Sequence, residues 1–155
     1  MARAKAGWLP DDAYRIVLKY VPIPTVDFVI VRGVDDRQEF LLGKRVEQPY
    51  KGSWFTLGGR IPKGERMDAA VRRHLKRELG IVNAPSQFIG CQDVWNPPRM
   101  GVRSHSIWHI YLVELQECAE VKPNHENAKV KWFRSINPRW PLPVRQALTR
   151  AGFSE

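Results

Sequence analysis

The chain is organised around residues 58–81, GGRIPKGERMDAAVRRHLKRELGI, which predict a glycine turn, a charged loop and one amphipathic helix. We expect the helix over about residues 66–80, with Gly80 as its natural stop. On a helical wheel of about 100° per residue, three apolar side chains fall within roughly 60° of Glu78. They are Met67, Val71 and Leu75. Because a carboxylate on an inward face is costly unless it is paired or bound to a cation, Glu78 is the first candidate functional residue.

Length and composition narrow the class of protein. The chain has 155 residues, 43% of them apolar and 26% charged, which is typical of a single globular domain over residues 1–155. No stretch approaches the roughly 18 apolar residues of a membrane span, and the basic N-terminus lacks the apolar segment of a secretory signal. The two cysteines, Cys91 and Cys118, make neither a disulfide framework nor a zinc quartet, so we expect a cytoplasmic location and no membrane partner.

The net charge of +9 favours anionic partners such as phosphorylated ligands or nucleic acid. A solvated basic surface explains the charge equally well. The basic residues are spread along the chain and form no tail or long run, which disfavours nucleic acid. The charge therefore narrows the kind of partner without identifying it.

Strand and helix signals alternate irregularly along the rest of the chain. A continuous β-branched and aromatic run at residues 26–31 predicts a buried strand that contains one acid, Asp27. A turn at residues 35–38 and a returning strand at residues 39–45 complete a hairpin. The other predicted elements are a helix from residue 11 or 12 to 20, strands at 54–57, 87–94, 106–115 and 129–134, a Pro- and Arg-rich loop at 95–103, and a C-terminal helix at 143–151. This is an α+β pattern rather than a regular βαβ series.

The glycine turn and the helix together offer the ligands of a hard cation. Glycine allows close approach of the backbone, so the Gly58 carbonyl and the Glu78 carboxylate are oxygen donors of the kind that Mg²⁺ or Mn²⁺ prefers. Arg60 follows the turn and Arg73 lies on the helix flank, where both could clamp a phosphate beside the ion. The alternative for Glu78 is a buried salt bridge to His74, one helical turn earlier.

The same residues carry a resemblance to a known family. The stretch resembles the Nudix box, written G-x5-E-x7-R-E-U-x-E-E-x-G-U with U apolar, and the matching positions are Gly59, Glu65, Arg73, Leu75, Glu78, Gly80 and Ile81. The box has glutamate where His74 and Arg77 stand. The resemblance implies the Nudix fold, an α/β/α sandwich around a mixed β-sheet, and Mg²⁺-dependent chemistry on nucleoside diphosphates linked to another group. In ordinary members the glutamates at the helix end bind the metals, so Arg77 argues against a multi-metal site.

One branch of the family, the GDP-mannose mannosyl hydrolases, lacks the same two glutamates. Residues 10–81 are similar to it, most clearly at 26–30, 39–45, 52–55 and 58–60. That branch breaks the carbon–oxygen bond at C1 of the sugar and releases GDP and free sugar, whereas other members cut the pyrophosphate. The roles that the resemblance implies are ligation of one Mg²⁺ by Gly58 and Glu78, neutralisation of the leaving diphosphate by Arg60 and Arg73, and contacts to sugar and diphosphate by Asp27 and Arg45.

The chain departs from this branch at the general base. The branch has a Gln-His pair shortly before the tryptophan of the late strand, with Gln on the metal and His as base. Here the two positions hold Glu126 and Asn127, and His125 stands one residue earlier. Glu126 can replace the Gln as a metal ligand, but Asn127 cannot accept a proton. His125 is therefore the candidate base, and the alternative is an exposed loop histidine.

Three functions are compatible with these residues. The first is a Mg²⁺-dependent hydrolase of a nucleotide sugar that gives GDP and free sugar, for which the resemblance also implies a homodimer. The second keeps the fold but cleaves the phosphoanhydride of a nucleoside diphosphate derivative. The third is a non-catalytic module that binds a nucleotide or nucleic acid. The retention of Glu78 and Arg73 favours an enzyme.

Overall fold

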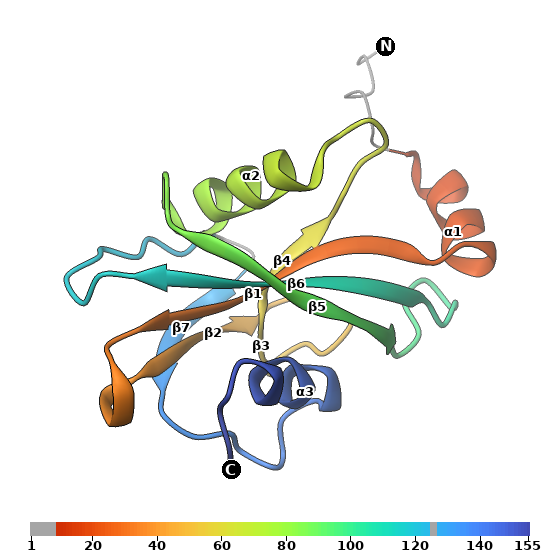
Figure 1. Cartoon of the computed structure of the whole chain (residues 1–155). Helices are drawn as coiled ribbons and strands as arrows, with labels where there is room; N and C mark the ends of the chain where they lie inside the picture. The colour runs from red at the N-terminus through yellow and green to blue at the C-terminus, as the bar shows by residue number, and fades with distance from the viewer. Residues whose placement is uncertain (1–8, 125–126) are drawn as a thin grey trace.

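The computed structural model describes residues 9–124 and 127–155, and it consists of one mixed sheet with helices on both faces (Figure 1). In chain order the elements are α1 Asp11–Tyr20, β1 Ile23–Arg32, a 3₁₀ turn Asp35–Arg37, β2 Glu39–Arg45, β3 Trp54–Phe55, β4 Leu57–Arg60, α2 Met67–Leu79, β5 Ser86–Trp95, β6 His105–Leu115, β7 Asn127–Phe133 and α3 Leu142–Arg150. Among the described residues, no helix combines the length and the apolar character needed to cross a bilayer.

Strand β1 organises the sheet. It pairs in parallel with β6 along its whole length, and it pairs antiparallel with β2 only over residues 30–32. Beyond that point β1 and β2 diverge, and residues 54–60 enter the fork between them. There β3 pairs with β2 and β4 pairs with β1. The remaining strands extend the sheet on either side, β5 beside β6 and β7 beside β2.

Successive side chains of β1 point to opposite faces of the sheet and pack in two different hydrophobic cores. Val26, Phe28 and Ile30 pack in the core that α2 covers, whereas Val29 and Val31 pack in the core that α3 covers. Figure 1 shows α2 and α3 on opposite faces of the sheet. Three apolar side chains of α3 are fully buried, namely Val144, Ala147 and Leu148. The expected α/β/α sandwich of the α+β class is therefore confirmed.

The predicted glycine turn is wrong, because Gly58 and Gly59 lie inside strand β4. Close packing explains why glycine stands there. Gly58 has a φ of +136°, and a Cβ at this position would lie 2.1 Å from the backbone oxygen of Val26. A Cβ at Gly59 would lie 2.7 Å from the His74 ring. The two glycines thus let β4 pass between β1 and helix α2.

Two smaller predictions from the sequence also differ from the structure. Met67 is 42% exposed, so the inward stripe of α2 begins only at Ala70. The predicted loop at residues 95–103 contains a tight hairpin in which Arg99 and Val102 exchange both backbone hydrogen bonds, at 2.9 and 3.0 Å. Both turn residues, Met100 and Gly101, have positive φ, as a two-residue hairpin of this kind requires.

Candidate functional site

A cleft of about 410 Å³ brings several of the predicted site residues together. It is bordered by helix α1, by the glycines of β4 and by the start of β6. Asp27, Arg45, Gly58 and Arg60 all line it. His125 and Glu126 lie outside the described residues, so the predicted base and the third predicted metal ligand stay predictions.

Glu78 lies on the inward face of α2 with 2% of its surface exposed, as its position on the helical wheel predicts. Its Oε2 accepts a hydrogen bond from the Gly58 backbone N–H at 3.2 Å, and its Oε1 lies 2.9 Å from His74 Nδ1. The second contact is the salt-bridge alternative that the sequence left open. A cation that binds Oε1 must therefore share this oxygen with the His74 ring or displace the ring from it.

His74 and Arg77, which replace the two box glutamates, both approach the remaining carboxylate. The His74 ring is 2% exposed, and its Nε2 lies 3.2 Å from the carbonyl oxygen of Arg60. A neutral imidazole can donate to only one of its two oxygen neighbours, whereas an imidazolium can donate to both. Arg77 Nη2 lies 3.4 Å from Glu78 Oε1. The end of α2 therefore presents one carboxylate beside an imidazole and a guanidinium instead of a carboxylate cluster.

Arg73 is turned toward the loop before α2. Its Nε and Nη2 donate to the two carboxylate oxygens of Glu65, both at 2.7 Å, and Nη2 also donates to the Arg60 carbonyl at 3.1 Å. The hydrogen bond from Arg73 lowers the pKa of Glu65 below its usual value. Arg73 does not line the cleft. Its geometry therefore suits a residue that positions Arg60 rather than one that contacts the leaving group.

Asp27 is a buried acid with 6% of its surface exposed, as its place in an apolar strand predicts. Burial, and to a smaller extent the nearby Glu78 carboxylate, raise its pKa to about 7 against the lowering effects of Thr25, Arg45 and Thr56. The Thr25 hydroxyl donates to Asp27 Oδ2 at 2.5 Å. Near neutral pH this carboxyl is therefore present in both protonation states, so it can accept or donate a hydrogen bond at the cleft wall.

Among the described residues, Arg45 and Arg60 are two of the four arginines that line the cleft. Arg45 Nε donates to the Pro49 carbonyl at 2.8 Å, and the guanidinium lies 5.1 Å from the centre of the Phe55 ring. The Arg60 guanidinium lies 4.4 Å from the centre of the Tyr14 ring. Packing against rings restricts both side chains. A cleft with two ordered guanidinium groups suits an anionic ligand such as a diphosphate.

The strand register directs the Gly58 backbone away from β1. The Ile61 N–H donates to the Pro24 carbonyl at 3.0 Å. In an antiparallel pair, hydrogen-bonded and non-hydrogen-bonded residue pairs alternate, so Gly59 and Val26 form a hydrogen-bonded pair. The next pair, Gly58 and Asp27, is therefore a non-hydrogen-bonded one. The Gly58 N–H accordingly reaches Glu78, and the Gly58 carbonyl is not used by β1. The two predicted metal ligands, Gly58 and Glu78, therefore lie next to each other.

These donors fit a single divalent cation rather than a cluster. Within residues 9–124 and 127–155, no three His, Cys, Asp or Glu side chains are grouped so as to hold a metal ion. One carboxylate and one carbonyl match the sparse protein ligation typical of Mg²⁺, which takes its other ligands from water and substrate phosphate. Arg77 lies beside the same carboxylate, and its positive charge disfavours the binding of a second cation there.

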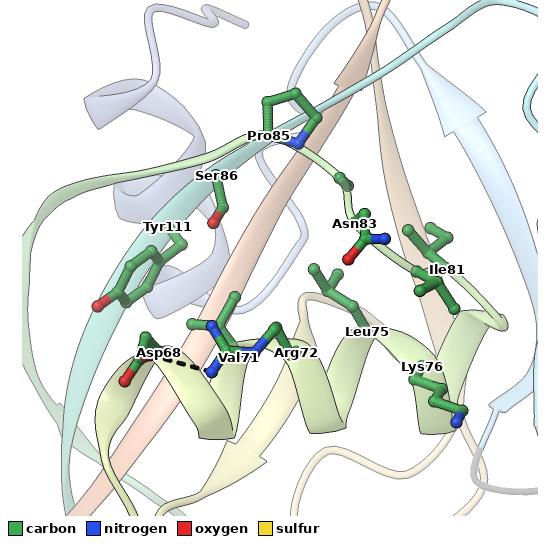
Figure 2. Close-up of a pocket in the computed structure, with 12 residues that line it drawn as sticks. Asp68, Val71, Arg72, Leu75, Lys76, Ile81, Asn83, Pro85, Ser86 and Tyr111 are labelled. Carbon is green, nitrogen blue, oxygen red and sulfur yellow. Dashed lines mark hydrogen bonds and ion pairs between the residues drawn. The ribbon is translucent and has the colours of Figure 1, made fainter.

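A larger hollow of about 630 Å³ lies between α2 and the segment at residues 81–86 that leads into β5 (Figure 2). Val71 and Leu75 of α2 lie toward Tyr111 across this hollow, and an ion pair of 3.0 Å joins Asp68 and Arg72 at one end. None of the predicted site residues within the described part of the chain lines it. The cleft at β4 is therefore the candidate functional site.

Sequence reasoning missed a polar group in the same cleft. Asn96, Ser104 and Ser106 are buried and line its far end. Asn96 directly follows β5 and lies in the segment that the sequence predicted as a loop, whereas Ser104 directly precedes β6 and Ser106 lies at its start, where the sequence predicted a strand from residue 106. The alternation of Ser104, Ser106 and Trp108 on one face of a strand was the only signal that could have found them.

Comparison with known proteins identifies the family. A sequence model described as the NUDIX domain matches residues 23–146. The low-salt glycan biosynthesis protein Agl8 of Haloferax volcanii is 37% identical over 75 residues, which is 47% of this chain and 44% of that protein. The ADP-ribose pyrophosphatase of Methanocaldococcus jannaschii is 29% identical over 120 residues, which is 77% of this chain and 65% of that protein. The chain thus spans less than two thirds of the length of either relative.

Solved structures share the fold. The NUDIX domain of Shewanella oneidensis NrtR, solved with ADP ribose, superposes with a TM-score of 0.65 at 19% identity, over 93% of this chain and 97% of that one. A MutT NUDIX hydrolase from Burkholderia pseudomallei superposes with a TM-score of 0.65 at 23% identity, over 82% of this chain and 97% of that one. The family match covers most of the chain and agrees with the sandwich architecture and with the box residues on α2. The chain therefore belongs to the NUDIX domain family.

Proposed function

We propose that this protein is a Mg²⁺-dependent hydrolase of nucleotide sugars, similar to GDP-mannose mannosyl hydrolase, that releases a nucleoside diphosphate and a free sugar by substitution at the sugar C1. The observation that carries the proposal is the combination of a single box carboxylate, Glu78, with a cleft bordered by Arg45, Arg60 and Asp27. One carboxylate suits one ion, and the guanidinium groups add the positive charge that a diphosphate leaving group needs. The glycan biosynthesis role in the name of the Haloferax relative agrees with a sugar-linked substrate.

The chain's own residues divide the work as follows. Gly58, Glu78 and Glu126 would hold the ion, which would stabilise negative charge on the departing phosphate. Arg45 and Arg60 bind the diphosphate oxygens at the cleft border. Asp27, paired with Gly58 across β1 and β4, hydrogen-bonds the sugar next to the reacting carbon.

The proposed reaction is a displacement at carbon. The oxygen of a water molecule attacks C1, the bond between C1 and the β-phosphate oxygen breaks, and a proton of the water passes to a base. His125 is the expected base. Arg73 takes no direct part, because its guanidinium is bonded to Glu65 and to the Arg60 carbonyl. It instead holds Arg60 and the loop that precedes α2.

Two other functions have support from separate observations. Cleavage of the phosphoanhydride in a nucleoside diphosphate derivative agrees with the ADP-ribose pyrophosphatase relative, whose match covers 77% of this chain. A non-catalytic module that binds nucleotide or nucleic acid agrees with the contact between Glu78 and His74, because that contact occupies the carboxylate that a metal would need.

A product analysis tests these three functions. The full chain is incubated with Mg²⁺ and a panel of nucleoside diphosphate sugars and ADP-ribose in ¹⁸O-labelled water, and the products are identified by mass spectrometry. Nucleoside diphosphate plus labelled free sugar supports substitution at C1. Nucleoside monophosphate, with the label in a phosphate group, contradicts it and supports the second function. Metal-independent nucleotide binding without turnover supports the third.

The expected homodimer and cytoplasmic location are further proposals. Ile16, Tyr20 and Val21 are exposed apolar side chains on α1 and at its end, and they offer surface that a dimer contact could bury. Sedimentation equilibrium over a range of protein concentrations tests the dimer, and a single monomeric mass throughout would contradict it.

A further inference from the structure

We infer that Asn96, Ser104 and Ser106 form a subsite that recognises the hydrogen-bonding edge of the substrate's nucleobase. The inference rests on the proposed function, because it assigns the nucleoside end of the same cleft. Three observations support it: the burial of these side chains, the hydrogen bonds among them and their position in the cleft. None of the three residues has a role in the function proposed above.

The three side chains form one bonded cluster. Asn96 Nδ2 donates to Ser106 Oγ at 3.0 Å and to Ser104 Oγ at 3.3 Å, and the Asn96 backbone N–H donates to the Ser104 carbonyl at 2.9 Å. All three residues are buried, so their polar groups are costly unless they are hydrogen-bonded. The internal bonds fix the orientation of the cluster before a ligand binds.

Internal bonding leaves part of the cluster's capacity unused. Both N–H groups of the Asn96 amide are taken, whereas its carbonyl oxygen and the proton of each serine hydroxyl have no partner among the residues that the structure describes. The cluster therefore presents two donors and one acceptor at the cleft wall. A phosphate offers only acceptors and would leave the Asn96 carbonyl unpaired. A nucleobase edge combines donors with acceptors and suits all three groups.

The strand register separates this cluster from the phosphate end. On β6, Ser106 lies beside Ile23 of β1, and Ile110 lies beside Asp27. Four residues of strand correspond to about 13 Å. Because the sugar C1 is bonded to the β-phosphate, the reacting sugar belongs near Asp27 and Gly58. The base, at the other end of the nucleoside diphosphate, is the part of the substrate that reaches the far end of the cleft.

Between the two ends, the cleft is lined by buried aromatic side chains. Trp108 stands two residues after Ser106 on the same face of β6, and its buried ring packs edge-on against Phe55 at 5.4 Å. Hydrogen bonds beside such side chains are stronger than in water, and an unpaired group there is more costly. The cluster can therefore discriminate strongly between base edges.

Binding of defined nucleotides tests the inference. Isothermal titration of the full chain in Mg²⁺ compares GDP, ADP and UDP with inorganic pyrophosphate. We expect wild-type affinities for the three nucleotides to differ by about tenfold or more. We expect Ser106→Ala to weaken the preferred nucleotide about tenfold while the pyrophosphate affinity stays within about twofold. Ser104→Ala is the second variant, and Ser86→Ala, which removes an exposed hydroxyl beside the other hollow (Figure 2), is the matched control and should change neither affinity.

Each remaining outcome bears on the inference. Equal weakening of nucleotide and pyrophosphate in the serine variants overturns it, since the cluster would then support the cleft as a whole. Wild-type affinities that are equal for the three bases also overturn it. If nucleotides bind and nucleotide sugars are hydrolysed with an unchanged base preference in both serine variants, this inference alone fails. If neither nucleotide nor pyrophosphate binds the wild type, the proposed function fails as well.

Discussion

Replacement of Glu78 by glutamine examines the residue on which the proposed metal site depends. Among the residues that the structure describes, the carboxylate has three polar neighbours: the Gly58 N–H at 3.2 Å, His74 Nδ1 at 2.9 Å and Arg77 Nη2 at 3.4 Å. Glutamine keeps the shape but loses the charge, so charge-assisted contacts become neutral ones. The difference between the two kinds of bond predicts a loss of about 1–3 kcal/mol in the free energy of unfolding. A domain of ordinary stability, about 5–15 kcal/mol, stays folded after such a loss.

Turnover should fall far more than stability. If Glu78 holds the ion that neutralises the leaving phosphate, Glu78→Gln should lower kcat by about 100-fold or more at saturating Mg²⁺. The assay is product formation from the best nucleotide sugar of the panel, with the fold checked by circular dichroism and urea unfolding. Glu117→Gln makes the same chemical change at an exposed position and should alter neither quantity.

His74→Gln separates a structural role of Glu78 from a role in metal binding. This variant removes the imidazole contact but keeps the carboxylate, so it should lose comparable stability and retain much more turnover than Glu78→Gln. A rate in Glu78→Gln within about twofold of wild type would remove the metal assignment. Equal losses of turnover in both variants would show that Glu78 serves the packing of α2 rather than an ion.

Three further outcomes are expected. Gly58→Ala should lower the free energy of unfolding by about 3 kcal/mol or more, because its Cβ would meet the Val26 oxygen at 2.1 Å and φ is +136°; urea unfolding with a loss below about 1 kcal/mol would contradict this. Arg73 lowers the pKa of Glu65, so this acid stabilises the fold above its unfolded pKa and the contribution is lost as pH falls through the lower folded value. Urea unfolding at pH 7 and pH 3 should therefore show a smaller loss of stability on acidification in Glu65→Gln than in wild type, and an equal loss would refute the assignment. If His125 is the base, His125→Ala should lower kcat by about 100-fold or more without weakening nucleotide binding, and an unchanged rate would mean that the proton goes elsewhere.

Local sequence patterns were sufficient to predict many of the helices and strands. The helical period of residues 67–79 places Glu78 on an inward face, and Gly80 ends the helix with a φ of +69°. The apolar run around Asp27 predicts a buried strand, and the hairpin return matches β2 at both ends. These features depend on side-chain periods of about 3.6 and 2 residues and on glycine's access to positive φ, all of which act over a few neighbouring residues.

Pairings between distant segments decided the rest of the site. The fork between β1 and β2 admits residues 54–60, and this alone makes the double glycine a strand instead of a turn. The direction of the Arg73 side chain toward Glu65 follows from the path of the loop before α2. The serines beside Asn96 meet it only through the register of β5 on β6. Strand register and side-chain direction depend on which segments pack together, and residues far apart in the chain settle that choice when they share one core.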